Sequence, residues 1–241
     1  MQKVEFSLKF EEVKDESKGY PVIVVAAGSS SRMKGVDKQF APVTGIPVIA
    51  RTLCRLEKSA HITEITVVTR KEKIADISKL AERYAIAKLK NIVEGGSSRE
   101  DSVKNGIVLY KDTAEKVLVH DGARPLVDLK TIENVALALE DCESVTCAVK
   151  VKDTIKRIDE NGIVKETLNR DELVSVQTPQ GVSVQKFLSA AEETDLASFT
   201  DDTSVMEYMG EKTKIVDGNY ENIKITTPQD IILAEAYLAK E

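Results

Sequence analysis

The stretch VVAAGSSSRMKGVDKQF, residues 24–40, decides the fold class of this chain. Its apolar run stops at Ala27, and a glycine and three serines follow directly. Spaced cations come next, namely Arg32, Lys34 and Lys38. Gly28 allows a sharp turn, and consecutive amides in such a loop form an anion-binding concavity. The stretch therefore predicts a buried strand that ends at an anion-binding loop; the alternative is a surface loop with solvated bases.

The loop matches neither of two common phosphate-binding motifs. No Gly-Lys-Ser/Thr follows Gly28, so the loop is not a Walker A motif. Ser30 stands where a dinucleotide fingerprint needs its second glycine. A polyphosphate is still the expected ligand, because Arg32 offers a planar fork of donors and Lys38 a mobile ammonium group.

Composition excludes several classes of protein. The 241 residues carry a net charge of −6 and are 42% hydrophobic, as is typical of a soluble globular protein. Nucleic acid and membranes are therefore not expected as partners. No apolar run approaches the length of a membrane span, and the mixed charges of residues 1–20 are not those of a signal peptide. Three cysteines without a CxxC spacing indicate reduced thiols in a cytoplasmic protein.

Hydrophobic patterning alternates between strands and helices up to residue 150. Strands are expected at 21–27, 64–69, 89–93, 117–120 and 145–149, and helices at 47–58, 71–84, 97–110 and 128–140. The expected helix starts are Ser97 with Glu100 in capping-box spacing, Asp128, Thr200, and Thr227 with Pro228 and Asp230. This alternation predicts an α/β fold with a Rossmann-like, doubly wound, mostly parallel sheet. We expect a single domain at 20–241 after an N-terminal extension at 1–19, although the length also suits two small domains.

The alternation of strands and helices is interrupted at about 151–172. There, apolar and polar residues alternate with period two around Asn161-Gly162. Asn-Gly between two such runs is a strong β-hairpin signal. The hairpin is too polar to be a core strand pair, and an isolated hairpin is marginal in water. We therefore expect a protruding β-arm that packs on the same arm of a second subunit, as in a homodimer. The alternative is a hairpin that lies on its own domain.

Four polar stretches follow expected strands: 28–38, 94–102, 120–125 and the run around Thr178. Ligands of open α/β sheets bind beyond the carboxyl ends of the strands, so these stretches are expected to converge on one crevice. Within 94–102, Gly96 allows close backbone approach to a ligand. Ser102 either contacts a base or ribose, or is a polar residue in the first helical turns.

The stretch HDGARP, residues 120–125, places a carboxylate at a strand end. Asp121 either holds a metal ion or a hydroxyl group, or forms a turn beside Gly122. Arg124 either binds a phosphate or pairs with an acid. His120 is interpreted as structural, because nothing nearby marks it as a base or a ligand.

Seven segments of the chain occur in an order that resembles one enzyme family. They read AAGSSSRM with DKQF, EGGSSREDSV, VHDGARPLV, VKDTIKR, QTPQGV, TDDTSVMEYMG and NIKITTPQD. Over about residues 21–238 the chain resembles the 2-C-methyl-D-erythritol 4-phosphate cytidylyltransferases of the non-mevalonate isoprenoid pathway. Ribitol 5-phosphate cytidylyltransferases share the fold and the first loop, but VKDTIKR followed by QTPQG looks more like the erythritol-phosphate enzymes.

The resemblance implies an enzyme that joins CTP to methylerythritol 4-phosphate and releases pyrophosphate, with Mg²⁺ bound mainly through the CTP phosphates and no metal-ligating residue assigned. The residues that it implies are catalytic Arg32 and Lys38, nucleotide-binding Ala26, Ala27, Gly28, Gly96, Ser102, Asp121, Gly122 and Lys224, and substrate-binding Asp121, Arg124, Thr154, Arg170 and Thr178. In the family, Thr154 and Arg170 would lie on an arm that reaches into the partner's active site.

Several positions depart from the family pattern. Ser30 replaces a glycine, Asp37 stands where proline is usual, Ser97 stands where some members have aspartate, and Gly122 replaces an alanine. None of these changes removes a charged catalytic group. Two alternatives to the family's activity remain: a ribitol 5-phosphate acceptor, and a non-catalytic CTP-binding regulatory protein on the same fold.

Overall fold

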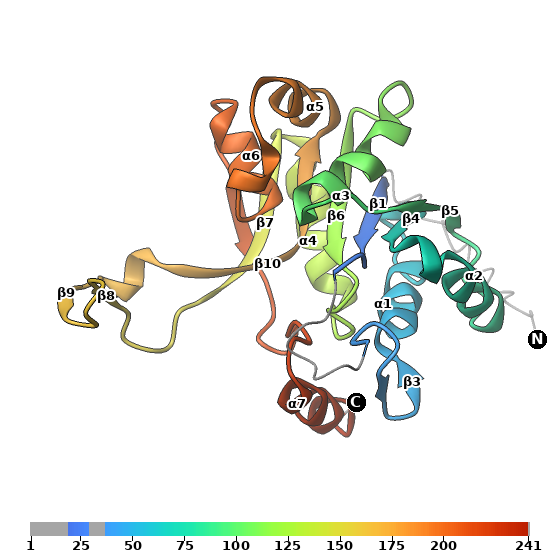
Figure 1. Cartoon of the computed structure of the whole chain (residues 1–241), viewed down its shortest axis with the longest axis horizontal. Helices are drawn as coiled ribbons and strands as arrows, with labels where there is room; N and C mark the ends of the chain where they lie inside the picture. Colours follow the sequence, from blue (N-terminus) through green and yellow to red (C-terminus); the bar gives the residue numbers. More distant parts are fainter. Residues whose placement is uncertain (1–18, 29–36, 241) are drawn as a thin grey trace, which may run out of the picture.

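Figure 1 shows a central sheet with helices on both faces and one hairpin that projects from the body. The computed structural model describes residues 19–28 and 37–240. The described residues form a seven-stranded sheet in the order β11-β7-β10-β6-β1-β4-β5. The strands are β1 Tyr20–Val25, β4 Ile62–Thr69, β5 Leu89–Glu94, β6 Lys116–Asp121, β7 Ser144–Lys150, β10 Val174–Ser183 and β11 Lys214–Asp217.

The predicted α/β fold with a doubly wound, mostly parallel sheet is confirmed. Neighbouring strands run parallel except around β10, which is antiparallel to both β6 and β7. The reason is the connection: β7 leads into the projecting hairpin and β10 returns from it, and a chain that folds back on itself pairs antiparallel. The prediction of a single domain at 20–241 is not decided by this topology, and most of the predicted extension at 1–19 lies outside the described residues.

β1 lies in the interior of the sheet, as its continuously apolar sequence predicts. Its side chains alternate between two cores: Val22 and Val24 belong to one cluster and Ile23 to the other. In the pairing register, Val25 lies opposite Val68 of β4 and Asp121 of β6. The three strands therefore end at the same edge, and the loops that follow them are brought together there.

Helices cover both faces of the sheet. They are α1 Val48–Glu57, α2 Ile74–Arg83, α3 Arg99–Ile107, α4 Leu129–Glu140, α5 Val184–Glu193, α6 Asp202–Tyr208 and α7 Pro228–Leu238. The cluster under Val22 and Val24 takes its helical residues from α1, α2 and α4, whereas the cluster around Ile23 takes them from α3, α5 and α6. In the described part of the chain, none of the helices combines the length and the apolar character that crossing a membrane requires.

α7 packs away from the main sheet and positions a further segment of the site. It lies against a small hairpin of β2 Pro42–Val43 and β3 Ile46–Pro47. Ile225 is buried in the same cluster as Ala123, and the Ile225 N–H donates to the carbonyl oxygen of Ala123 at 2.8 Å. The segment before α7 is thereby held beside the loop that follows β6.

Two of the predicted helix caps are displaced by one residue. α3 is capped by Ser98 with Asp101, not by Ser97 with Glu100, and α6 is capped by Asp201, not by Thr200. Each stretch offers adjacent polar residues, and only the direction of the incoming backbone selects between them. The other two starts are confirmed, since Asp128 caps α4 and Thr227 forms a capping box at α7.

The predicted hairpin is confirmed at Asn161-Gly162. β8 Lys156–Ile158 and β9 Val164–Thr167 pair antiparallel, and Gly162 has a φ of +79°, which favours glycine. The hairpin and its two connections, about residues 151–172, are called the arm below. The arm leaves the body between β7 and β10 (Figure 1).

Candidate active site

A cavity of about 390 Å³ lies at the ends of β1 and β6, where three of the predicted stretches meet. The predicted residues that line it are Ala27, Gly28, Lys38, Gly96, Ser102, Asp121 and Lys224. Ala26 and Gly122 instead lie in the backbone beneath: Ala26 N–H donates to Val68 O at 2.7 Å, and Gly122 N–H donates to Val25 O at 2.9 Å. Arg32 lies outside the described residues.

A second cavity, of about 480 Å³, adjoins the first. Its lining comes from β7, β10 and the start of α6, and it includes Arg124 and Thr178. Arg99, Asp121 and Lys224 line both cavities. The site therefore offers two neighbouring compartments with charged side chains where they join.

Asp121 is the centre of this junction. Its Oδ2 lies 2.9 Å from Lys224 Nζ and 3.2 Å from Arg124 Nε, and its Oδ1 lies 3.6 Å from Arg99 Nε. Burial alone would raise the pKa of this carboxyl group, but Lys224, Arg99 and Arg124 outweigh burial and hold the pKa of Asp121 well below its usual range. Asp121 is therefore ionised at neutral pH and gathers three cations at the point where the cavities meet.

Arg99 is a site residue that the sequence analysis missed. Its Nη1 and Nη2 donate to Asp202 Oδ1 and Oδ2 at 2.9 and 2.7 Å, a two-point geometry that fixes the guanidinium plane. Burial opposes the charge, yet Asp202 holds the pKa of Arg99 above its usual value. The partner lies 103 residues away in the sequence, so no local pattern could have identified the pair.

The loop before α3 is shaped by a glycine and two serines. A Cβ atom on Gly96 would lie 2.4 Å from Asp101 Cβ, so no other residue fits there without a shift. Ser102 Oγ accepts from Gly96 N–H at 3.0 Å and donates to Ser98 O at 2.8 Å. The hydroxyl group of Ser102 thus holds the loop in shape at the wall of the first cavity.

His120 and Thr178 brace the loop that carries Asp121. Asp121 N–H donates to Thr178 Oγ1 at 3.0 Å. Nε2 of His120 lies 3.4 Å from Arg124 O, which can only accept, so Nε2 carries the proton of the neutral ring. Nδ1 therefore accepts from the Thr178 hydroxyl at 3.0 Å. Burial lowers the pKa of His120 to about 4, despite the opposing charge of Asp121, and the ring is neutral. This agrees with a structural His120; Thr178, however, lies within β10 and not beyond a strand end.

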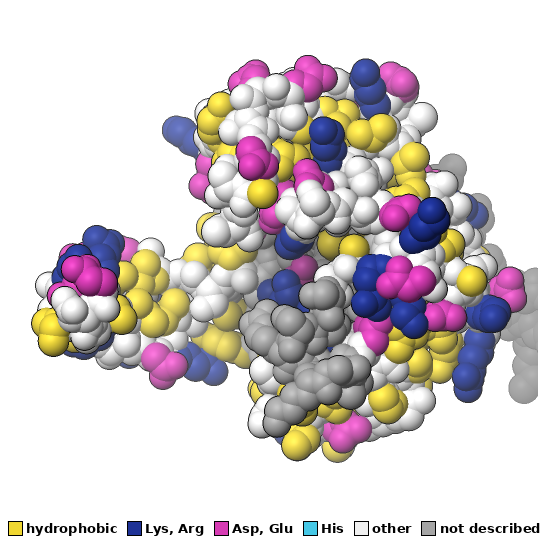
Figure 2. Space-filling view, viewed as in Figure 1, with side chains coloured by type: hydrophobic (Ala, Val, Ile, Leu, Met, Phe, Trp, Pro, Cys, Tyr) yellow, Lys and Arg dark blue, Asp and Glu magenta, His cyan; other side chains and the backbone are white. Residues whose placement is uncertain are grey.

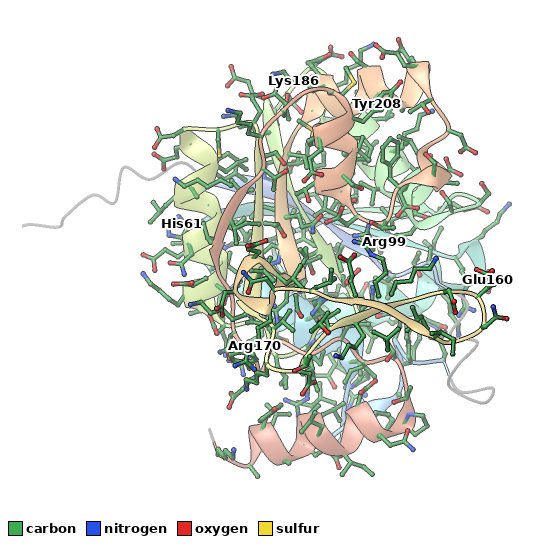
Figure 3. All side chains as sticks on the ribbon, turned by 90° about the vertical axis from the view of Figure 1, so that its left-hand side faces the viewer. His61, Arg99, Glu160, Arg170, Lys186 and Tyr208 are labelled. Carbon is green, nitrogen blue, oxygen red and sulfur yellow. The ribbon has the colours of Figure 1, made fainter. Side chains whose placement is uncertain are left out.

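Thr154 and Arg170 are both exposed on the arm and line neither cavity. Arg170 Nη1 donates to Lys152 O at 3.1 Å. Figure 3 shows Arg170 and Glu160 on the arm and Arg99 in the body of the molecule. The two arm residues are therefore not brought to this chain's own cavities.

The donor set in the first cavity suits a metal ion bound through a ligand's phosphates. Asp121 is the one carboxylate among the described residues that line this cavity, and its oxygens already face Lys224, Arg124 and Arg99. Divalent cations that keep several waters bind proteins through few carboxylates and through substrate phosphates. The described residues also contain no cluster of three or more His, Cys, Asp or Glu able to hold a metal ion.

Two adjoining cavities with a cationic junction, at the strand ends of a doubly wound sheet, are typical of an α/β protein that binds phosphorylated ligands. The sequence model of the 2-C-methyl-D-erythritol 4-phosphate cytidylyltransferase family matches residues 21–240. The chain therefore belongs to this family.

Individual relatives agree with this assignment. The chain is 43% identical over 223 residues to a 2-C-methyl-D-erythritol 4-phosphate cytidylyltransferase of Clostridium acetobutylicum, covering 90% of this chain and 96% of that protein. It is 41% identical over 222 residues to one of Bacillus mycoides, covering 91% and 97%. The crystal structure of 4-diphosphocytidyl-2C-methyl-D-erythritol synthase from Anaerococcus prevotii aligns with a TM-score of 0.82 at 35% identity, covering 92% of this chain and 96% of that one.

Proposed function

We propose that this chain transfers the cytidylyl group of CTP to 2-C-methyl-D-erythritol 4-phosphate and releases pyrophosphate, the activity for which its relatives are named. The observation that carries the proposal is the junction at Asp121, where cations serve two adjoining cavities. The relatives favour this acceptor over ribitol 5-phosphate, and favour an enzyme over a non-catalytic CTP-binding protein.

The first cavity takes CTP and the second takes the acceptor. An oxygen of the acceptor's phosphate attacks the α-phosphorus of CTP, the bond to the bridging oxygen breaks, and pyrophosphate leaves with that electron pair. The nucleophile is already an anion, so no general base is needed, and the protein contributes positioning and charge neutralisation. We assign Lys38 and Arg32 to the charge on the α-phosphate and the leaving group.

The remaining residues bind and orient the two substrates. Ala27 and Gly28 supply backbone at the triphosphate, Ala26 and Gly122 hold the strands beneath them in place, and Gly96 and Ser102 hold the loop at the cytidine. Asp121 keeps Lys224 and Arg124 in place for the phosphates, and Thr178 holds Asp121. Mg²⁺ bound through the CTP phosphates would add neutralising charge, and Asp121 is the one carboxylate among the described residues that line this cavity.

The chain is also proposed to form a homodimer through the arm. In this dimer, Thr154 and Arg170 of one subunit contact the acceptor that is bound in the other subunit. Exposed apolar side chains gather on the arm and at the adjoining start of β10, namely Ile155, Ile158, Ile163, Val164, Val174 and Val176. Figure 2 shows hydrophobic side chains along this projection. In a monomer these apolar side chains would be exposed to water, which is unfavourable, whereas a second copy of the chain would bury them. The free cysteines support a cytoplasmic location.

Pyrophosphate release by the purified protein with CTP and Mg²⁺ tests the activity. We expect release with 2-C-methyl-D-erythritol 4-phosphate and none with ribitol 5-phosphate. Release with ribitol 5-phosphate alone would change the acceptor and keep the mechanism. Absence of release with both acceptors, from protein that binds CTP, would exclude the transfer reaction.

A further inference from the structure

An ion pair beside the first cavity has no part in the chemistry above. Asp37 directly precedes Lys38, and Arg70 directly follows β4. Arg70 Nη2 donates to Asp37 Oδ2. The two side chains are 31% and 20% exposed, so the pair is partly shielded from solvent. It ties the segment that carries Lys38 to the end of the strand next to β1.

Asp37 also organises the turn in which Lys38 lies. Its Oδ1 accepts from Gln39 N–H at 3.1 Å. Its backbone oxygen accepts from Phe40 N–H at 3.1 Å and from Ala41 N–H at 3.0 Å. Three consecutive amides after Lys38 thus point at Asp37, and the position of Asp37 sets the position of the turn.

The far end of the turn is held by a different element. Ile49 N–H, at the start of α1, donates to Gln39 O at 2.9 Å. Lys73 Nζ lies 4.7 Å from the centre of the Phe40 ring. These contacts fix the residues after Lys38, whereas the Asp37–Arg70 pair fixes the residue before it. Lys38 itself faces the first cavity.

We propose that Arg70 is a positioning residue that acts on Lys38 through Asp37. Its guanidinium group holds the Asp37 carboxylate at the turn and neutralises an anion beside a cavity that takes a triphosphate. Without Arg70, the Asp37 carboxylate competes for the Lys38 ammonium group and repels the nucleotide. The proposal rests on the proposed function, because it assumes that Lys38 acts on CTP.

The identity of residue 37 decides whether the turn needs Arg70 at all. Asp37 is one of two residue types that could stiffen the turn, and proline is the other. Proline presets φ and needs no partner to stiffen a turn, whereas aspartate needs a cation to hold it. Arg70 is that cation, and the aspartate makes the turn depend on it.

A double-mutant cycle on pyrophosphate release, at saturating CTP and acceptor, tests this dependence. We expect Arg70→Ala to lower kcat about tenfold, since small displacements of a catalytic group are costly. Asp37→Pro is expected to keep kcat within about twofold of the parent, and adding Arg70→Ala to it to cost less than about twofold. Lys71→Ala removes the neighbouring exposed cation and is the matched control, with no change expected.

CTP affinity by calorimetry and melting temperature complete the test. Arg70→Ala is expected to weaken CTP binding about threefold, and only when Asp37 is present. A merely structural contact would lower the melting temperature and leave kcat and CTP affinity unchanged, which would overturn the proposal. Equal losses with and without Asp37→Pro would also overturn it, because Arg70 would then contact the nucleotide directly. The calorimetric readout needs no acceptor, so a failed acceptor assignment is distinguished from a failed role for Arg70.

Discussion

Arg99 and Asp202 join the N-termini of α3 and α6 through two hydrogen bonds of 2.9 and 2.7 Å. Arg99 lines both cavities, and Asp201, next to Asp202, lines the second. Asp202 is fully buried. The pair therefore connects the wall of the first cavity to the wall of the second by a planar, two-point contact.

Removing Asp202 tests how far the structure depends on this pair. We expect Asp202→Ala to lower the free energy of unfolding by about 3 kcal/mol, because it removes the nearest counter-ion of a largely buried guanidinium group and leaves only the longer contacts of 3.6 Å to Glu100 and Asp121. Denaturant-induced unfolding would measure the change. Asp112→Ala, at an exposed carboxylate, is the control and is expected to stay within about 0.5 kcal/mol of the parent. Equal effects of the two substitutions would show that the pair contributes little to stability.

Lys38 is expected to contribute to the rate and not to folding. Its side chain is half-buried at the cavity wall, outside the three apolar cores. Lys38→Ala should lower kcat about 10²- to 10³-fold, as loss of a transition-state charge contact does. Turnover at saturating substrates, with circular dichroism as a check on folding, measures this. Lys79→Ala, an exposed lysine of α2, should leave turnover unchanged; comparable turnover in both variants would remove Lys38 from the mechanism.

The buried His120 is expected to make the folded protein less stable in acid. Its pKa falls from the usual 6.5 to about 4 in the folded protein because the ring is buried. The unfolded chain therefore binds the extra proton first, and the stabilising contribution is complete above about pH 6.5. It is lost as the pH falls from 6.5 toward 4, by about 3 kcal/mol in total. Unfolding free energies measured across this window test the prediction.

A matched substitution isolates this histidine. His120→Gln removes the titrating group, so the slope of stability against pH between about 6.5 and 4 should flatten, even though the variant is less stable at pH 7. His61→Gln, at the only other histidine in the sequence, is the control for the loss of a histidine side chain. Asp121 also loses its ion pairs in acid, but in a lower range, since its pKa is held below the usual value. A slope that survives His120→Gln would assign the pH dependence elsewhere.

Local patterns predicted most of the fold. The apolar run before Gly28, the Asn161-Gly162 hairpin and the cap at Asp128 each depend on neighbours in sequence, and the structure confirms all three. The direction of β10 and the choice of Ser98 over Ser97 as a cap depend instead on how distant segments meet. These are decided by tertiary packing, to which local propensity is insensitive.

The site residues divide in the same way, into those that local sequence patterns predict and those that depend on contacts between distant segments. Asp121 stood at a predicted strand end, and its register opposite Val25 brings it to the first loop. Which cations pair with Asp121 could not be predicted from the sequence, because Lys224 and Arg99 come from separate parts of the chain. The bond from Thr178 to His120 spans 58 residues, so a single sequence gave no reason to pair them. Polar contacts between residues far apart in the sequence are therefore the part of the site that could not be predicted from local patterns.

The arm allows a test of whether one subunit completes the site of another. Lys38→Ala inactivates a subunit's own cavity, and Arg170→Ala inactivates its arm. If the arm acts on the partner, unfolding and refolding the two inactive variants together in equal amounts should restore about a quarter of the parent activity. Half of the dimers would be mixed, and each would hold one intact site with one intact arm. Pyrophosphate release by the mixture measures this. If Arg170 served its own chain, every site would lack one residue and the mixture would remain inactive.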